Sequence, residues 1–279
     1  MKKLAPFILI TVFSLFLIGN LQTSNAAERP ATQTLYLLGD SWTQQAADDH
    51  GTFEKALLER GLADSIDVQS FAISGSTADE WANDNGNRLS NLTNAIKNDP
   101  LPNPVVFFTL GGNDLRDAFI AGPNPAAYDD IEADVRVVIN ALNASRSDIK
   151  IVMGGYDILN PDISPAICNF AANALFGSTD PAVVNPYVIQ LYDTIKIVAD
   201  DFDHVDAINT NGSLQGTPGN PAIDQWSPVG LIADCIHPNS AGYDLYIGTV
   251  FDQRLETLLM STNTSASFAI LLPFVSTGE

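Results

Sequence analysis

Apolar residues gather along this chain in short continuous runs that are separated by longer segments. Five runs have the length of buried strands, at 34–38, 66–73, 105–110, 149–153 and 204–208. Runs that are apolar at nearly every position are typical of parallel strands covered on both faces. The pattern therefore predicts a parallel sheet of five strands.

The segments between these runs carry apolar residues at helical spacing, which predicts helices at 52–60, 77–97, 127–142, 186–199 and 239–259. We expect the polar stretch 83–86 to interrupt the second helix. Pro186 suits the first turn of the fourth helix, and Asn239 or Ser240 suits the cap of the last. Strands that alternate with helices predict an α/β fold with helices on both sides of the sheet.

Two stretches, 156–185 and 209–233, are rich in proline or glycine and are expected to be irregular. Each follows a predicted strand, and ligands bind beyond the carboxyl ends of strands in open α/β sheets. They are therefore either walls of a substrate pocket or ordinary surface loops, and the sequence does not decide between these alternatives.

The first residues have the layout of an export signal: Lys2 and Lys3, an apolar run at 4–18, and small residues before a cleavage position after Ala26. The apolar run is shorter than the ~20 residues that cross a bilayer. We therefore expect a signal peptide at 1–26, a single domain at 27–260, and a C-terminal tail at 261–279 of unknown role. The mature protein would be secreted or periplasmic, with no membrane span.

The chain has a net charge of −20, which becomes −22 when Lys2 and Lys3 are removed. A field of this sign repels nucleic acid, so we expect no nucleic-acid partner. The charge also favours neutral or cationic substrates weakly, but a heavily hydrated exported surface is the better explanation of it. The oligomeric state is left open.

Four short polar blocks follow predicted strands or open the last helix, and they hold residue types that ester hydrolysis needs. The first places Ser41 in a Gly-Asp-Ser-Trp sequence directly after the first strand. A serine hydroxyl becomes a nucleophile when a neighbouring base takes its proton. Ser41 is therefore the candidate nucleophile, although such a triplet alone is also common in turns.

The base is expected in the last block, Asp-Cys-Ile-His-Pro, which contains Asp234 and His237. In a tight loop, this spacing lets the carboxylate accept a hydrogen bond from Nδ1 of the imidazole and leave Nε2 free as a base. Pro238 favours extended backbone at His237. The other two histidines, His50 and His204, have no comparable neighbours and are interpreted as structural.

Attack on an ester creates an oxyanion, which needs hydrogen-bond donors at its final position. The candidates are the backbone N–H of Ser41, the backbone N–H of Gly75 in the second block, and the side-chain amide of Asn113 in the third. Gly75 and Asn113 taken singly are better explained by turns. Their position at successive strand ends makes the functional interpretation the stronger one.

The chain has two cysteines, Cys168 and Cys235. An exported protein keeps disulfides, so we predict one bridge that ties the stretch 156–185 to the histidine block. The alternative is two buried free thiols. No paired cysteines or cysteine–histidine cluster indicate a metal site.

The four blocks resemble those of the SGNH hydrolases, also called GDSL esterases and lipases, with Ser41, Gly75, Asn113 and His237 at the naming positions. The resemblance extends from residue 35 to about residue 259. It implies a flavodoxin-like three-layer α/β/α sandwich with a five-stranded parallel sheet, Asp234 as the triad acid, and no metal or organic cofactor. Trp42 departs from the family, where leucine is commonest, and is expected to alter the pocket mouth.

These features predict a secreted serine esterase or lipase that hydrolyses carboxylic esters of small molecules, lipids or sugars through an acyl-enzyme. A carbohydrate O-acetylesterase, a thioesterase or an acyltransferase could use the same site. The alternative from another class is a non-catalytic carbohydrate- or lipid-binding protein of this fold. The sequence lacks a Gly-x-Ser-x-Gly elbow, which disfavours the common α/β-hydrolase arrangement.

Overall fold

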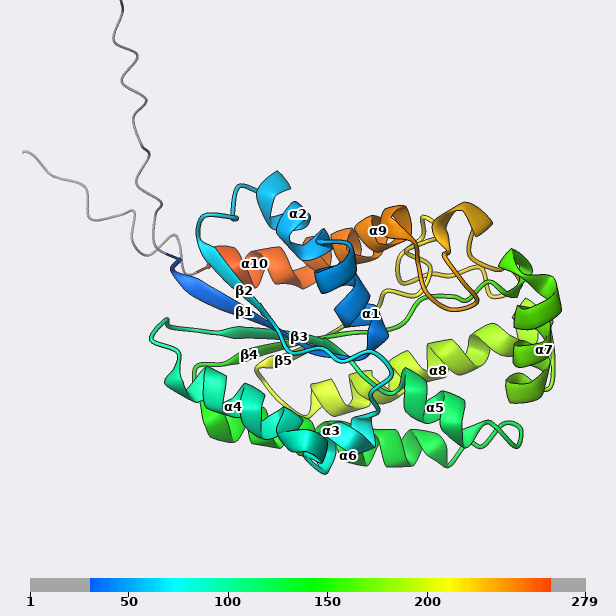
Figure 1. Ribbon diagram of the computed structural model, residues 1–279, viewed down its shortest axis with the longest axis horizontal. Helices are drawn as coiled ribbons and strands as arrows, with labels where there is room; N and C mark the ends of the chain where they lie inside the picture. The colour runs from blue at the N-terminus through cyan, green and yellow to red at the C-terminus, as the bar shows by residue number, and fades with distance from the viewer. Residues whose placement is uncertain (1–30, 262–279) are drawn as a thin grey trace, which may run out of the picture.

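The computed structural model describes residues 31–261, so the expected signal peptide and the tail from residue 262 onward lie outside the described residues. A single parallel sheet in the strand order β2-β1-β3-β4-β5 organises the described chain (Figure 1). This order is that of flavodoxin-like sheets, and it confirms the predicted fold class. The strands are β1 (Gln33–Gly39), β2 (Ile66–Ser70), β3 (Val105–Thr109), β4 (Lys150–Gly154) and β5 (Val205–Ile208).

The central strands are buried along their length because helices cover both faces of the sheet. Every residue of β1 and of β3 is buried, as the unbroken apolar runs predicted. The second strand is shorter than expected, but backbone hydrogen bonds to β1 continue beyond it, from Phe71 to Leu37 (2.7 Å) and from Ile73 to Gly39 (2.8 Å). The block that contains Gly75 is thereby held beside the end of β1.

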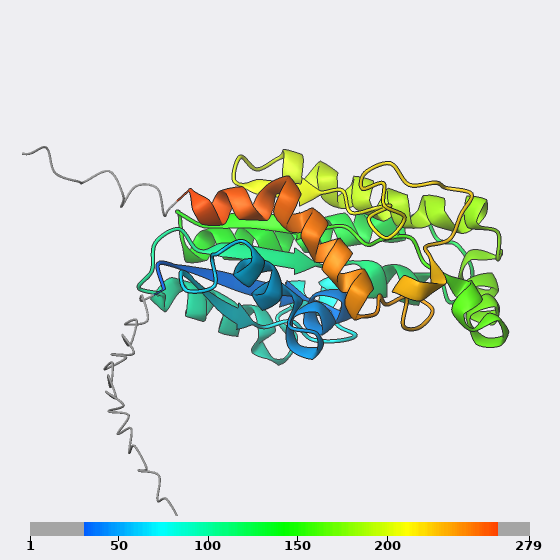
Figure 2. The same cartoon turned by 90° about the horizontal axis from the view of Figure 1, so that it is seen from above.

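Helices form two layers around the sheet (Figures 1 and 2). One layer contains α1 (Ser41–Gln44), α2 (Thr52–Glu59), α9 (Ser240–Val250) and α10 (Glu256–Met260). The other contains α3 (Ala78–Ala82), α4 (Arg88–Asn98), α6 (Ala127–Ser145) and α8 (Pro181–Asp200). Short π-helical turns, η1 (Gln45–Asp49) and η5 (Phe251–Leu255), continue α1 and join α9 to α10.

The predicted break in the second helix is confirmed. The chain leaves the helical conformation between α3 and α4, where Asp84, Gly86 and Asn87 have φ values of +54°, +68° and +59°. Asn239 caps α9, because its side chain accepts a hydrogen bond from the N–H of Gly242. The polar residues at 83–86 and Asn239 therefore lie at helix ends, as the sequence predicted.

The position of Pro186 was predicted wrongly. Helix α8 begins at Pro181, after Asp180 accepts a hydrogen bond from the N–H of Ala182 (3.0 Å), and Pro186 lies inside the helix. A proline in a helix removes one backbone hydrogen bond. Here it follows the start of α8 closely, and the buried residues of the later turns hold the helix in place.

The stretch 156–185 was also predicted wrongly, because it is not irregular throughout. It contains a short 3₁₀ turn, η3 (Pro161–Ile163), and the helix α7 (Pro165–Phe176). Helix α7 has no charged residue, so it lacks the contrast between polar and apolar faces that reveals most surface helices. In contrast, 209–233 is irregular apart from the single turn η4 (Val229–Leu231).

A buried carboxylate organises the first part of this irregular stretch. Asp157, just beyond β4, is fully buried and accepts hydrogen bonds from the N–H groups of Ile158 (2.6 Å), Gly212 (2.6 Å) and Leu214 (2.7 Å). Burial raises the pKa of Asp157 to about 6, against the opposing effect of these donors. The loop therefore folds around an internal acceptor.

Candidate active site

Ser41 lies at a sharp change of direction between β1 and α1. Gly39 has a φ of +131°, and a Cβ there would lie 2.4 Å from the carbonyl oxygen of Thr109, so only glycine fits. The side chain of Asp40 accepts a hydrogen bond from the N–H of Trp42 (3.0 Å) and caps α1. Ser41 is thereby the first residue of the helix, at the carboxyl edge of the sheet.

The block with Asp234 and His237 is a tight loop closed by its own acidic residue. One carboxylate oxygen of Asp234 accepts hydrogen bonds from the backbone N–H groups of Ile236 (2.8 Å) and His237 (2.7 Å). Below the loop, Ile232 and Pro238 form an antiparallel bridge. These contacts within the loop hold the backbone of His237 in place and so orient its imidazole ring.

The structure brings the three predicted side chains into one chain of hydrogen bonds. Nε2 of His237 lies 2.7 Å from Oγ of Ser41, and Nδ1 lies 2.8 Å from the second carboxylate oxygen of Asp234. Partial burial alone raises the pKa of Asp234, but the hydrogen bonds from the ring and backbone of His237 and from Ile236 outweigh it and lower the pKa to about 2. Asp234 is therefore ionised at any ordinary pH, as a carboxylate that orients an imidazole must be.

Asn113 is buried on α5 (Gly112–Ala118), a helix that the sequence pattern did not predict. One hydrogen of its amide is donated to the backbone carbonyl of Ser76 (2.9 Å). Asn113 and Ser41 line the same cavity. The amide is thus held at a fixed distance from the end of β1.

Gly75 is placed less directly. It is exposed, has a φ of +80°, and borders a second cavity, half of whose lining residues are acidic residues of α3, α5 and α6. It is not among the residues that line the cavity at Ser41. Its neighbour Ser76 donates a hydrogen bond to the carbonyl of Gly39 (3.1 Å). The block therefore lies next to the nucleophile turn, and a role for the N–H of Gly75 stays a prediction.

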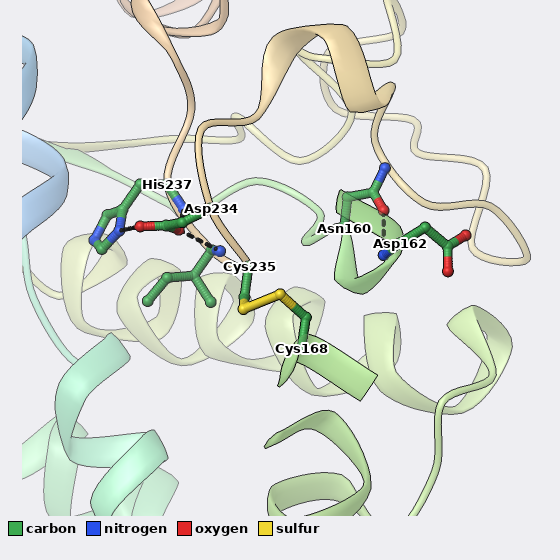
Figure 3. Close-up of a disulfide and its surroundings, with 7 residues drawn as sticks. Asn160, Asp162, Cys168, Asp234, Cys235 and His237 are labelled. Atoms are coloured by element: carbon green, nitrogen blue, oxygen red, sulfur yellow. Dashed lines mark hydrogen bonds and ion pairs between the residues drawn. A yellow bond between two sulfur atoms is a disulfide. The ribbon is translucent and has the colours of Figure 1, made fainter. Parts of the chain in front are cut away.

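The predicted disulfide between Cys168 and Cys235 is present, with the sulfur atoms 2.09 Å apart. It joins α7 to the loop between Asp234 and His237, as Figure 3 shows. The two partners are 67 residues apart in sequence. The pairing that the sequence analysis gave as one of two alternatives is thus the one that forms.

A cavity of about 400 Å³ adjoins Ser41. Its walls come from α1, α5, α7, α8, the segment that follows β4 and the histidine loop, and most of its lining is apolar: Trp42, Leu115, Leu159, Leu175, Val188 and Leu191. Of the two stretches proposed as pocket walls, 156–185 contributes through Tyr156, Leu159 and α7. The stretch 209–233 contributes no residue to this lining, although the histidine loop follows it directly.

A model of the GDSL-like lipase/acylhydrolase family matches residues 37–245 of the sequence. The chain belongs to this family. It is therefore a carboxylic ester hydrolase, and the family resemblance predicted from its four blocks is confirmed. A search of curated proteins finds no match.

Solved structures share the fold of this GDSL-type hydrolase at low sequence identity. The acetyl xylan esterase AlAXEase has a TM-score of 0.53 and 17% identity, over 80% of this chain and 100% of that one. A catalytic mutant of an acetylxylan esterase from Geobacillus stearothermophilus has a TM-score of 0.54 and 15% identity, over 81% and 95%. A GDSL-like lipase candidate from Parabacteroides merdae has a TM-score of 0.57 and 13% identity, over 80% and 95%. At such identities the likeness concerns the fold.

Sequence reasoning missed one buried link in the site of this hydrolase. The hydroxyl of Tyr156 donates a hydrogen bond to Asp40 and accepts one from the N–H of Gly112 (3.0 Å). Burial raises the pKa of Asp40 to about 6, although the hydrogen bonds from Tyr156, Trp42 and Thr109 act against it. The only sequence signal was the place of Tyr156 after the glycine pair that ends β4.

Trp42 was expected at the pocket mouth, but it is buried. Its ring packs edge-on against Tyr156, Tyr243 and Tyr246, with centroids 5.5, 6.2 and 5.2 Å apart. It forms an inner wall of the cavity. The tyrosines around it accommodate a side chain larger than the leucine that is commonest in the family.

The other two histidines lie outside this cavity lining. His50 packs against the ring of Tyr243, and His204 forms a hydrogen bond with Asn143. Among residues 31–261, no cluster of histidine, cysteine and acidic side chains is arranged to hold a metal ion. In the same part of the chain, none of the helices is both long and apolar enough to span a bilayer.

Proposed function

We propose that this protein is an exported serine esterase in which Ser41, His237 and Asp234 form the catalytic triad. The observation that carries the proposal is the unbroken chain of hydrogen bonds from Ser41 through His237 to Asp234. Nε2 of His237 takes the hydroxyl proton as Oγ of Ser41 attacks the acyl carbon. The carboxylate of Asp234 stabilises the imidazolium that forms.

The tetrahedral intermediate places a negative charge on the former carbonyl oxygen. The backbone N–H of Ser41, the N–H of Gly75 and the free amide hydrogen of Asn113 are the proposed donors to it. His237 then gives its proton to the leaving alcohol, and the acyl group stays on Ser41. A water molecule, activated by His237 in the same way, releases the carboxylic acid.

Substitution of Ser41 tests the nucleophile. Ser41→Ala should fold like the wild type and lose turnover of p-nitrophenyl acetate by several orders of magnitude, as in other triads. A serine-directed phosphonate should label the wild-type protein at Ser41. Ser65→Ala, at the opposite end of the sheet, is the matched control and should react normally. Labelling elsewhere, or activity that survives in Ser41→Ala, would contradict the assignment.

A carbohydrate O-acetylesterase is the second candidate, and the shared fold with two acetylxylan esterases favours it. A thioesterase or an acyltransferase would use the same triad. Release of acetate from acetylated xylan, compared with hydrolysis of p-nitrophenyl esters of increasing length, separates the sugar ester from the simple ester. Family membership leaves no support for a purely binding protein.

Export is the second part of the proposal. The layout of residues 1–26 motivates it, and the disulfide between Cys168 and Cys235 is consistent with an oxidising compartment. Secretion or release into a periplasm should yield a chain that begins at Ala27. Sequencing the N-terminus of the expressed protein checks this, and a full-length chain retained in the cytoplasm would exclude it.

A further inference from the structure

The cavity beside Ser41 is built from the side chains of four helices, the segment that follows β4 and the histidine loop. Helix α5 contributes Leu115, α8 contributes Val188 and Leu191, and α7 contributes Ala171 and Leu175. Its volume of about 400 Å³ lies in the range of small-molecule sites. A space of this kind next to the nucleophile must hold one part of the ester.

The charged side chains that line this cavity already have partners. Asp40 is bound by Trp42, Thr109 and Tyr156, Arg116 pairs with Asp117 at 2.7 Å, and Asp234 binds His237. A sugar ring placed against the apolar part of the lining would leave most of its hydroxyl groups without matching side chains, which costs affinity. A hydrocarbon chain carries no such cost.

Helix α7 forms one wall and is fixed from two sides. The disulfide joins its Cys168 to Cys235 in the histidine loop (Figure 3). At its other end, Phe176 stacks on Tyr187, with ring centroids 5.6 Å apart, and meets Phe119 edge-on at 5.8 Å. Helix α7 is therefore connected to the histidine loop at one end, and to α8 and the end of α5 at the other.

From this geometry we propose that the cavity binds the aliphatic chain of the ester substrate, and that α7 sets the chain length it accepts. This inference rests on the proposed function, because the chain must be attached to the carbonyl that Ser41 attacks. It assigns the substrate class as esters with an unbranched, uncharged hydrocarbon chain, in preference to acetylated sugars.

The cavity volume limits the length of the chain. A space of about 400 Å³ admits a hydrocarbon chain of several carbons. We therefore expect kcat/KM to rise with chain length and then to level off at the length that the cavity holds. Each buried methylene should raise kcat/KM by about two- to fourfold up to that length, and longer chains should gain nothing more.

Two substrate series measure this on the mature protein with its disulfide intact. The first varies the acyl chain of p-nitrophenyl esters from two to sixteen carbons. The second keeps acetate and varies the alcohol from two to ten carbons, which distinguishes an acyl chain from an alcohol chain. A rise and plateau in kcat/KM in either series supports the proposal and shows which part of the ester the cavity binds.

Two variants of the same helix test the role of α7. Ala171→Phe fills part of the cavity and should lower kcat/KM for the preferred chain at least tenfold more than it lowers kcat/KM for acetate esters. Ala174→Phe makes the same change on the exposed side of α7, outside the cavity lining, and should behave like wild type.

Kinetics that are flat with chain length in both series would overturn the proposal, as would equal effects of Ala171→Phe and Ala174→Phe. The failure of the proposed function is distinguishable from this. In that case no ester would be turned over and the phosphonate would not label Ser41, whereas a wrong chain assignment leaves acetate hydrolysis and labelling intact.

Discussion

The two halves of the active site are held in place by different means. Ser41 and Asn113 lie where buried parallel strands end, and both are buried. His237 and Asp234 lie in a surface loop, and the side chain of Asp234 is 54% exposed. The first half depends on the sheet and its hydrogen bonds, whereas the second depends on local turns and on one covalent bond to α7.

This contrast indicates where the site is vulnerable. Moving the nucleophile requires disturbing the core of the domain, which costs most of the free energy of folding. Moving the histidine loop requires only the loss of a few exposed hydrogen bonds and the disulfide. Three experiments separate the two halves, and they follow in order of decreasing expected effect.

Removal of the disulfide should act on the histidine half. In the chain-entropy model, a bridge that closes a loop with a 67-residue separation stabilises the fold by about 4 kcal/mol. The double variant Cys168→Ala/Cys235→Ala should therefore unfold at lower urea concentration and should lose activity, because His237 is less firmly placed.

A reductant supplies the matched comparison for this variant. It should lower the activity and melting temperature of the wild type and leave those of the double variant unchanged. A thiol count on denatured, unreduced protein should find no free thiol. Activity that stays constant while stability falls would mean that the loop keeps its position without the bridge.

Substitution of Asn113 tests the half of the site at the strand ends, because it should weaken stabilisation of the transition state. Loss of one oxyanion donor typically lowers kcat by about a hundred- to a thousandfold, so Asn113→Ala should do the same. KM should change little, because the donor acts mainly on the transition state. If KM rises and kcat holds, Asn113 binds substrate and is not an oxyanion donor.

Acidification should produce the smallest effect, again on the histidine half. The pKa of Asp234 is about 2 in the folded protein and near its ordinary value of about 3.8 when unfolded. The ionised carboxylate therefore stabilises the fold above about pH 4, and this contribution is lost as the pH falls toward 2. Because the side chain is half exposed, we expect at most about 1 kcal/mol.

Urea unfolding of the wild type and Asp234→Asn at pH 5 and at pH 2.5 measures this contribution. The difference between the two proteins should be larger at pH 5, and added salt should reduce it. A difference that grows on acidification has the wrong sign and would show that Asp234 is protonated more easily than its contacts imply.

The same contrast separates what the sequence predicted from what it did not. The strands and the residues at their ends were predictable because apolar runs bounded by Gly-Asp-Ser or Gly-Gly-Asn leave few alternatives. The histidine loop was predictable because Asp234 and His237 interact over three residues. Both signals are local, because each is contained in a short segment of the sequence.

Three features were missed because nothing in their own segments marks them. Helix α7 carries no charge to mark its outer face, and Pro186 looked like the start of a helix that begins at Pro181. The hydrogen bond from Tyr156 to Asp40 spans 116 residues. A pattern within one segment contains no information about such a pairing.

The hydroxyl of Tyr156 has a mechanical consequence. It bridges the residue before Ser41 and the residue before Asn113, by way of Asp40 and the N–H of Gly112. One side chain therefore connects the start of the nucleophile helix directly to the start of the helix that carries the amide. The spacing between the attacking oxygen and the amide is thus fixed by this connection as well as by the pairing of β1 with β3.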